Sequence, residues 1–336
     1  MAAPMAAAEQ AGNPPCVIIA GPTASGKSAL ALGLAGALGG TIINADAMQS
    51  YRDLRILTAR PTAAEEQEVP HLLYGYRAAA DLGTVASWRV DALAAAAAAT
   101  RGGRVPILCG GTGMYLTAFT AGLAEIPDPG PGARAEARSL LADMGPAALH
   151  ARLAARDPDT AARLRPSDGQ RIARAWEILA GTGTGLTVWQ ARPALPPAPY
   201  RMFAILLDPP RPALRAAIEA RFETMLAQGA VEEVRALLGQ GLDPALPLMR
   251  AHGVPELAGC VRGDISLVEA ARRAITETAA YTKRQATWFR HHNLAPSTYA
   301  RTISARIGES EQYMEYILPD LRNFLQRPVD ASQHGA

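Results

Sequence analysis

The chain has 336 residues, of which 49% are hydrophobic and 19% charged. That composition is typical of a folded globular protein and excludes a fibrous chain or one that is disordered throughout. The 33 basic and 31 acidic residues give a net charge of +2, so the overall charge neither requires nor excludes a nucleic-acid partner. At roughly 150 residues per domain, the length predicts two domains, or one domain with a substantial insertion.

Residues 1–15 are rich in alanine and proline and lack both a basic start and a long apolar core. They predict a disordered leader rather than a secretory signal, and residues 326–336 are expected to form a disordered tail. No run of about 18 apolar residues occurs, so no membrane span is expected. The three cysteines are few and widely spaced, which predicts neither a disulfide framework nor a zinc site and fits a reducing cytoplasm.

Four short apolar runs, each ending in a polar or glycine-rich loop, are typical of buried strands. Helix-like stretches at residues 28–38 and 87–100 lie between them. Strands that alternate with helices predict right-handed crossovers and a mainly parallel sheet, and therefore an α/β fold. The four runs are residues 17–20, 41–44, 105–108 and 203–207.

The composition changes between residues 127 and 199, where arginine- and alanine-rich helical segments are bracketed by PDPGPG and RPALPPAP. Such proline and glycine clusters mark boundaries. We therefore predict an all-helical insertion domain at 127–199 within a core domain formed by 16–126 and 200–325. Further helices are expected in the C-terminal region, at 212–238, 267–291 and 304–326.

The sequence GPTASGKS at 21–28 fits the pattern G-x-x-x-x-G-K-[ST], follows a predicted strand and opens a predicted helix. In this context the backbone N–H groups face a phosphate chain, Lys27 supplies a positive charge and the Ser28 hydroxyl can ligate Mg²⁺. Lys27 and Lys283 are the only lysines, which makes a chance match rare. The motif predicts a P-loop NTPase-like core but leaves open which polyphosphate is bound.

Asp46 closes the second predicted strand. Because the carboxyl ends of neighbouring parallel strands surround one crevice, we expect this carboxylate to face the phosphate-binding loop. There it could bind Mg²⁺ or act as a general base, and capping of a helix is the structural alternative. The loops at 23–28, 46–49 and 110–113 are predicted to converge on this crevice. Met48, Gln49 and Tyr51 are suited either to reading a base or to core packing.

Several helical faces carry residues with two interpretations. The predicted helix at 168–177 has a basic and amidic face that fits either RNA phosphates or solvent. Arg221 borders an apolar stripe and could bind a diphosphate or pair with a glutamate. Tyr281, Arg284 and Trp288 share one face, which suits base stacking or ordinary packing. The apolar stripe consists of Leu214, Ile218, Phe222 and Met225, and the basic residues of the predicted insertion include Arg134, Arg138, Arg171 and Arg174.

These motifs alone leave three classes of function open. A P-loop kinase of a nucleoside or small metabolite would use Lys27, Ser28 and Asp46 for ATP, Mg²⁺ and an acceptor hydroxyl. A non-catalytic RNA-binding ATPase would use the insertion to hold stems. The third is a transferase that acts on an RNA base.

In combination, the motifs resemble those of the bacterial tRNA isopentenyltransferase (dimethylallyltransferase) family over residues 16–292. The segments that carry the resemblance are GPTASGKS at 21–28, NADAMQSYRDLRILTARPT at 44–62, VPH at 69–71, GRVPILCGGTGMYLTAFTAGL at 103–123, QRIARAWEI at 170–178, RFETML at 221–226, MRAHGVPEL at 249–257 and KRQATWFR at 283–290. Residues 278–285 depart from the family, because they read TAAYTKRQ where relatives often read T-R-x-Y-A-K-R-Q.

The resemblance implies transfer of a dimethylallyl group from dimethylallyl diphosphate to N6 of adenosine 37 in tRNA, by a monomeric cytoplasmic enzyme that uses Mg²⁺. Asp46 would take the N6 proton, Arg221 would neutralise the leaving group, and Thr23 would assist. Gly21, Pro22, Thr23, Ala24, Ser25, Gly26, Lys27 and Ser28 would bind the diphosphate, with Ser28 on the metal. The expected tRNA contacts are Asp46, Ala47, Met48, Gln49, Thr112, Arg134, Gln170, Arg171, Ile172, Ala173, Arg174, Arg250, Lys283 and Arg284.

Overall fold

The computed structural model describes residues 12–192, 194–308 and 311–326, without the side chains of 311–313. Most of the predicted leader and tail lies outside these ranges. Inside them, Pro15 already belongs to the first strand and Gln326 ends the last helix. The chain divides into two compact units, Met1–Ala121 with Ala198–Ala336, and Gly122–Pro197. The smaller unit thus starts and ends slightly before the predicted insertion at 127–199.

The larger unit is built on a six-stranded sheet in which every neighbouring pair of strands is parallel, in the order β3-β2-β4-β1-β7-β8. In the central strand, Ile18 lies opposite Leu108 on one side and Ala204 on the other. The predicted mainly parallel α/β sheet is confirmed. Its strands are β1 (Pro15–Ala20), β2 (Gly40–Asn44), β3 (His71–Leu72), β4 (Val105–Gly110), β7 (Arg201–Leu207) and β8 (Ala300–Ile303).

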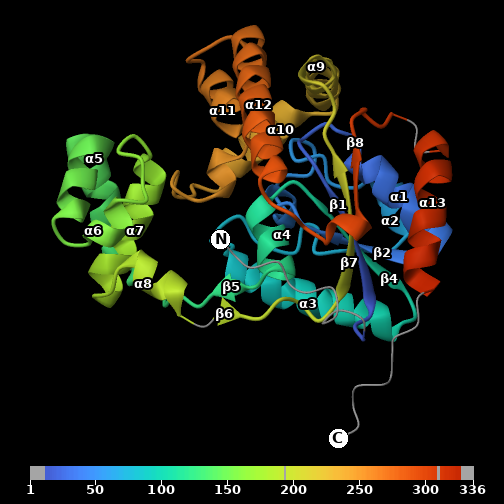
Figure 1. Ribbon diagram of the computed structural model, residues 1–336. Coiled ribbons are helices and arrows are strands. Elements are labelled where there is room, and N and C mark those ends of the chain that lie inside the picture. The colour runs from blue at the N-terminus through green and yellow to red at the C-terminus, as the bar shows by residue number, and fades with distance from the viewer. Residues whose placement is uncertain (1–11, 193, 309–310, 327–336) are drawn as a thin grey trace, which may run out of the picture. The chain divides into compact units, whose positions relative to one another are not determined.

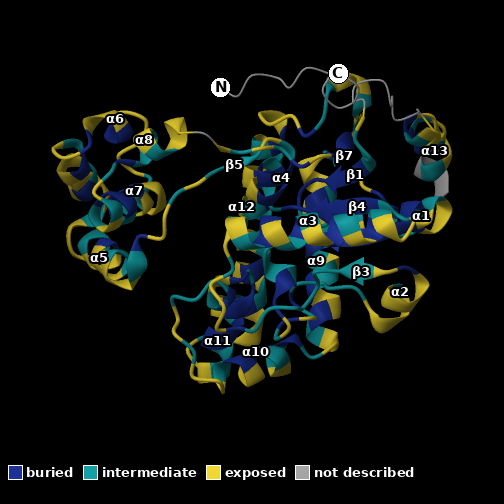
Figure 2. Ribbon diagram, turned by 90° about the horizontal axis from the view of Figure 1, so that it is seen from below, coloured by how far each residue is buried: buried dark blue, intermediate teal, exposed yellow. Residues whose placement is uncertain are grey.

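Helices cover both faces of this sheet (Figure 1). Side chains alternate along β1, so that Ile18 packs with α3 (Val85–Arg101) and α4 (Gly113–Thr120), whereas Ile19 packs with α1 (Lys27–Leu38) and α13 (Glu311–Gln326). Both faces are therefore apolar, as a parallel sheet requires. Figure 2 shows the central strands β1, β4 and β7 in the dark blue of buried residues.

A third apolar core joins the helices that follow β7 to the segment after β2. Phe222 and Met225 of the predicted stripe are buried in it, together with Leu57 and Leu257. The elements around this core are η2 (Met48–Ser50), α9 (Arg211–Ala227), α10 (Ala230–Leu238), η3 (Leu248–Arg250), α11 (Val254–Arg262) and α12 (Leu267–Arg290). The unit also contains α2 (Ala63–Glu68) and η4 (Ser297–Tyr299).

The smaller unit is mainly helical, with α5 (Gly130–Ala154), α6 (Pro158–Ala161), α7 (Gly169–Thr182) and α8 (Leu186–Ala191). Two short antiparallel strands, β5 (Leu123–Ala124) and β6 (Ala194–Leu195), join its ends. Its core includes the fully buried Trp176, whose indole N–H donates to Glu136 Oε1 at 3.0 Å. The helix α5 is interrupted at Gly145, which has φ +75° and precedes Pro146.

Three predictions about elements were wrong in detail. Residues 304–308 are not helical, because the chain forms the edge strand β8 first and α13 begins only at Glu311. The helix expected over 212–238 is broken at Gly229, whose φ of +100° begins a second helix in a new direction. The insertion predicted to be all helical contains the strand β6 (Ala194–Leu195), which, like β3, is too short to carry a periodic signal in the sequence. In the part of the chain that the structure describes, no helix is both long and apolar enough to cross a bilayer.

Candidate active site

The phosphate-binding loop connects β1 to α1, and its two glycines are required by sterics. A Cβ atom on Gly21 would lie 2.5 Å from the Leu207 carbonyl oxygen, and one on Gly26 would lie 2.2 Å from the Ile307 carbonyl oxygen. Gly26 also has φ +96°, a left-handed conformation that only glycine adopts at low cost. The loop therefore packs closely against β7 and against the segment that follows β8. Helix α1 begins directly after it, at Lys27.

Lys27 is half-buried, and its Nζ donates a hydrogen bond to the Pro22 carbonyl at 2.7 Å. The pKa of Lys27 is lowered to about 8, mainly by burial; the acidic groups of Cys109 and Asp46 oppose this shift, and the positive charge of Arg221 adds to it. Burial of the charged ammonium group therefore costs free energy, and a bound anion would offset this cost. Ser28 is exposed beside it.

Asp46 lies just beyond the end of β2 in a turn organised by the buried Asn44. The Asp46 backbone N–H donates to Asn44 Oδ1 at 2.8 Å, and Asn44 Nδ2 donates to the Asp46 carbonyl at 2.9 Å. The carboxylate accepts one hydrogen bond, from the Met48 N–H to Oδ1 at 3.0 Å. Because a carboxylate has four acceptor positions, most of its capacity is left for a substrate.

The loop after β4 is docked onto the Asp46 turn. The Ala47 N–H donates to Thr112 Oγ1 at 2.9 Å, and the Thr112 N–H donates to the Ala45 carbonyl at 3.1 Å. A Cβ atom on Gly110 would lie 2.1 Å from the Ala45 carbonyl, so the close approach of the two loops depends on that glycine. The Thr112 hydroxyl proton remains available as a donor.

Gln285 of α12 connects this loop to the phosphate-binding loop, a role that no motif in the sequence indicates. Its Oε1 accepts from the Thr23 N–H at 2.9 Å, and its Nε2 donates to the Gly111 carbonyl at 2.9 Å. The side chain is buried, with 5% of its surface exposed. Together with the Thr112 contacts, these bonds bring the loops at 23–28, 46–49 and 110–113 together, as predicted. Only the tertiary structure reveals the bridge, because its partners lie 262 and 174 residues away.

Arg221 lies on α9 beside the buried Phe222. Burial is the main cause that lowers the pKa of Arg221, while the charge of Asp46 acts in the opposite direction. Among the described residues, none forms a hydrogen bond or ion pair with its guanidinium. Lys27, Asp46 and Arg221 therefore lie close enough to influence one another at one edge of the sheet, and both cations keep donors free for an anionic ligand.

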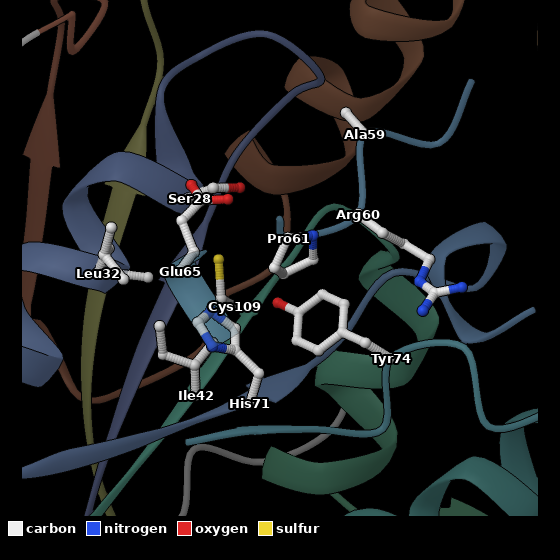
Figure 3. A pocket seen from close by; sticks show the side chains of 11 residues that line it. Ser28, Leu32, Ile42, Ala59, Arg60, Pro61, Glu65, His71, Tyr74 and Cys109 are labelled. Carbon is white, nitrogen blue, oxygen red and sulfur yellow. The ribbon is translucent and has the colours of Figure 1, made fainter. Parts of the chain in front are cut away.

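A pocket opens beside Ser28, between α1, the segment before α2, and the strands β2 and β4 (Figure 3). In Figure 3 the Tyr74 hydroxyl points toward Cys109. The lining mixes apolar side chains with polar and charged ones, so it favours neither a hydrocarbon group nor a phosphate. The lining residues are Ser28, Ala31, Leu32, Ile42, Ala59, Arg60, Pro61, Glu65, His71, Tyr74 and Cys109.

The residues that the resemblance assigned to RNA binding differ in accessibility. Arg250, Lys283 and Arg284 are exposed on the larger unit. Gln49 uses its amide N–H groups within the protein, because Nε2 donates to the Thr58 and Ala59 carbonyls at 2.8 and 3.0 Å. Only its carbonyl oxygen is left for a base. Tyr51 is a core residue, 2% exposed.

In the smaller unit the assigned residues lie on α5 and α7. Gln170, Arg171 and Arg174 are exposed, and Arg134 is half-buried and pairs with Asp128 at 2.5 Å. The expected contact through Ile172 was wrong for its side chain, because that side chain is fully buried in the helical core. Ala173 is half-buried. Because successive residues of a helix point in different directions, Ile172 faces the helical core while Arg171 and Arg174 face solvent.

The family model described as IPP transferase matches residues 49–292. The chain belongs to the IPP transferase family. It is 60% identical over 311 residues to the tRNA dimethylallyltransferase of Acidiphilium cryptum, covering 93% of this chain and 94% of that one. It is 57% identical over 329 residues to the enzyme of the same name from Gluconacetobacter diazotrophicus, covering 98% and 99%. The chain is thus a transferase, as predicted.

Solved structures of IPP transferases share the fold. The tRNA isopentenylpyrophosphate transferase of Bacillus halodurans is 29% identical, with a TM-score of 0.66 over 93% of this chain and 97% of that one. A eukaryotic dimethylallyltransferase acting on tRNA has a TM-score of 0.75 at 23% identity, over 95% and 81% of the two chains. At that identity the likeness concerns the fold alone.

The side chains present fit a magnesium ion of the kind that accompanies a phosphate chain. The described residues contain no group of three or more His, Cys, Asp or Glu that could hold a metal alone. Mg²⁺ in phosphate sites is usually held by one or two protein groups, with water and phosphate oxygens completing the shell. The exposed Ser28 hydroxyl at the start of α1 suits that arrangement.

Proposed function

We propose that this IPP transferase moves a dimethylallyl group from dimethylallyl diphosphate to N6 of adenosine 37 in tRNA. The products are N6-dimethylallyladenosine and diphosphate. The observation that carries the proposal is that hydrogen bonds join both the loop at 21–28 and the Asp46 turn to the loop after β4, at the carboxyl edge of one sheet. A base and a diphosphate site are thereby adjacent, and the name that the relatives carry supports this substrate pair.

Asp46 serves as the general base. The exocyclic amine of adenine is a poor nucleophile because its lone pair is delocalised into the ring, so its proton must be shared as the new bond forms. As the N6–C bond forms, the proton passes to the carboxylate of Asp46. The Met48 N–H on Oδ1 orients this side chain, and the Asn44 contacts fix the backbone that carries it.

The phosphate-binding loop stabilises the negative charge of the leaving diphosphate. As the C–O bond of the allylic diphosphate breaks, negative charge grows on the leaving oxygen. Lys27 and Arg221 stabilise this charge, and the Ser28 hydroxyl would hold Mg²⁺, which supplies further charge neutralisation when bound. The Thr23 N–H is occupied by Gln285, so Thr23 contributes through its hydroxyl rather than through its backbone.

The target base must leave the stacked anticodon loop to reach Asp46. We propose that the exposed cations of α7 in the smaller unit hold the RNA backbone, and that Thr112 donates its hydroxyl proton to the extruded adenine. The enzyme is proposed to act in the cytoplasm as a monomer. Phosphate contacts position the RNA, while contacts with base edges select it.

The decisive experiment incubates the purified protein with dimethylallyl diphosphate and unmodified tRNA, followed by mass analysis of the nucleosides. We expect N6-dimethylallyladenosine and an equal amount of diphosphate. A kinase would instead turn over ATP and leave the tRNA unchanged, since Lys27 and Ser28 would serve a nucleoside triphosphate equally well. Turnover of ATP without prenyl transfer would therefore refute the proposal.

A further inference from the structure

The segment after β8, residues 304–308, lies directly on the phosphate-binding loop. The Ile307 N–H donates to the Ser25 carbonyl at 3.1 Å, and Arg306 Nε donates to the Ala24 carbonyl at 3.1 Å. The segment leaves no room for a side chain at Gly26, because a Cβ atom there would lie 2.2 Å from the Ile307 carbonyl oxygen. These contacts involve residues outside 49–292, the range of the family match.

Arg306 holds an unusual part of the loop. Ala24 has φ +65°, a left-handed conformation that residues other than glycine rarely adopt. Its carbonyl is the one that accepts from Arg306 Nε. The hydrogen bond uses one of the five N–H groups of the guanidinium, so the donors of both terminal nitrogens remain available for a ligand.

Arg306 is also part of a cluster of like charges. It is close enough to Arg221 to lower the pKa of that arginine, and Arg221 in turn lowers the pKa of Lys27. Within the described ranges, none of the three cations forms an ion pair with a carboxylate. Asp46 is the carboxylate whose charge acts on both Lys27 and Arg221. Positive charges gathered without matching partners repel one another unless an anion binds between them.

We propose that Arg306 is a third cation of the diphosphate site, and that its terminal nitrogens bind the diphosphate of the allylic substrate and of the product. This inference rests on the proposed function for the identity of the ligand. The competing explanation is that Arg306 only braces the Ala24 carbonyl. The two explanations differ in whether the charge of the side chain, or merely its hydrogen bond, is needed.

The test measures binding of inorganic diphosphate with Mg²⁺ by calorimetry, in the full-length protein and its R306Q and R306K variants. Glutamine can still donate to the Ala24 carbonyl but has no charge, whereas lysine keeps the charge without the planar fork. We expect R306Q to weaken diphosphate binding about tenfold, which corresponds to about 1.4 kcal/mol. We expect R306K to lose less diphosphate affinity than R306Q. In both variants, tRNA affinity should stay within twofold of that of the unaltered protein.

Arg104 provides the matched control. Its Nε donates to the Gly40 carbonyl at 3.1 Å, so it too binds a backbone carbonyl, but at the amino-terminal edge of the sheet. R104Q should leave diphosphate affinity unchanged. If R306Q binds diphosphate as tightly as the unaltered protein, Arg306 is only a brace and the proposal is overturned.

The result is separable from the proposed function, because binding of diphosphate requires no prenyl transfer. If the unaltered protein makes no N6-dimethylallyladenosine but R306Q still binds diphosphate tenfold more weakly, the assignment of Arg306 stands and the proposed reaction fails. To detect a folding defect, the thermal unfolding midpoint of each variant is compared with that of R104Q. Should R306Q unfold earlier, the R306K variant still decides: affinity retained there supports the charge, and affinity reduced as fully as in R306Q overturns it.

Discussion

The carboxylate of Asp46 is the residue on which the proposed chemistry depends most directly. A hydrogen bond from the Met48 N–H orients it, and its charge acts on that of Lys27. A general base typically contributes a factor of about 10²–10⁴ to the rate. The contribution to RNA binding is expected to be small, because one side chain among many contacts is altered.

The substitution Asp46→Asn tests this division. We expect prenyl transfer to fall by a factor of about 10² to 10⁴, since the amide cannot take the N6 proton, while tRNA affinity stays within a few-fold. Single-turnover rates and equilibrium binding to unmodified tRNA measure the two effects. Asp264→Asn, at an exposed aspartate paired with Arg262, is the control and should leave both unchanged. Equal losses in rate and in affinity would contradict the assigned role.

Lys27 gives the site a pH dependence whose sign can be stated. Its pKa is lowered from 10.5 to about 8, so the folded protein releases this proton more readily than the unfolded chain. Between these values the unfolded state binds more protons, and stability from this group rises with pH. Relative to Lys27→Met, which does not titrate, the unaltered protein should gain about 2 kcal/mol in free energy of unfolding between about pH 7 and 9.5. Urea unfolding at both pH values measures the difference, and a constant gap between the two proteins would contradict the lowered pKa.

At the scale of elements, the long helix α12 matters through a single buried amide. Gln285 joins the loop after β1 to the loop after β4, so α12 fixes the distance between these two loops. Without this amide, the Thr23 N–H and the Gly111 carbonyl would each lose the hydrogen bond that Gln285 makes with them. A buried group left unsatisfied costs about 1–3 kcal/mol.

Gln285→Ala is expected to lower the free energy of unfolding by about 1–3 kcal/mol and to reduce the rate of transfer at saturating substrate by at least about tenfold. The physical reason is that two loops which must hold reacting groups in register are no longer bridged. Gln240→Ala is the matched control, because Gln240 makes a single exposed contact with Asp53. A variant that loses stability but keeps the full saturated rate would show that the bridge does not position the loops.

At the scale of the whole molecule, we propose that the larger unit performs the chemistry and that the smaller unit binds RNA. The smaller unit has its own apolar core around Trp176 and Ile172, and its exposed cations lie on helices that this core supports. Replacing both Arg171 and Arg174 with glutamine should weaken tRNA binding at every tRNA alike, because phosphate contacts carry no sequence information.

We expect the slope of log affinity against log salt to fall by about 1–2 for this double variant, roughly one for each arginine that no longer neutralises a phosphate. Binding of inorganic diphosphate should be unchanged. Arg215→Gln, an exposed arginine paired with Glu219 on α9, controls for the loss of surface charge. The measurement is a salt titration of tRNA binding, and an unaltered slope would exclude α7 from the RNA interface.

The meeting of the loops at 23–28, 46–49 and 110–113 could be predicted from the chain itself. The glycines and the lysine of residues 21–28 identify the predicted phosphate-binding loop. The glycines allow its tight backbone, and the lysine supplies a positive charge. Asp46 follows from its place after a buried strand, since parallel strands end at a common edge. Local pattern was sufficient wherever a residue's role depends on its immediate neighbours and on the period of its element.

The tertiary structure alone decided the contacts that join distant segments. Gln285 and Arg306 reach the phosphate-binding loop from 262 and 282 residues away, and no sequence period encodes such a meeting. The burial of Ile172 inside a stretch assigned to RNA likewise depends on which face of α7 meets its neighbours. Side-chain chemistry states what a residue can do, but the packing of helices and strands determines which partners it has.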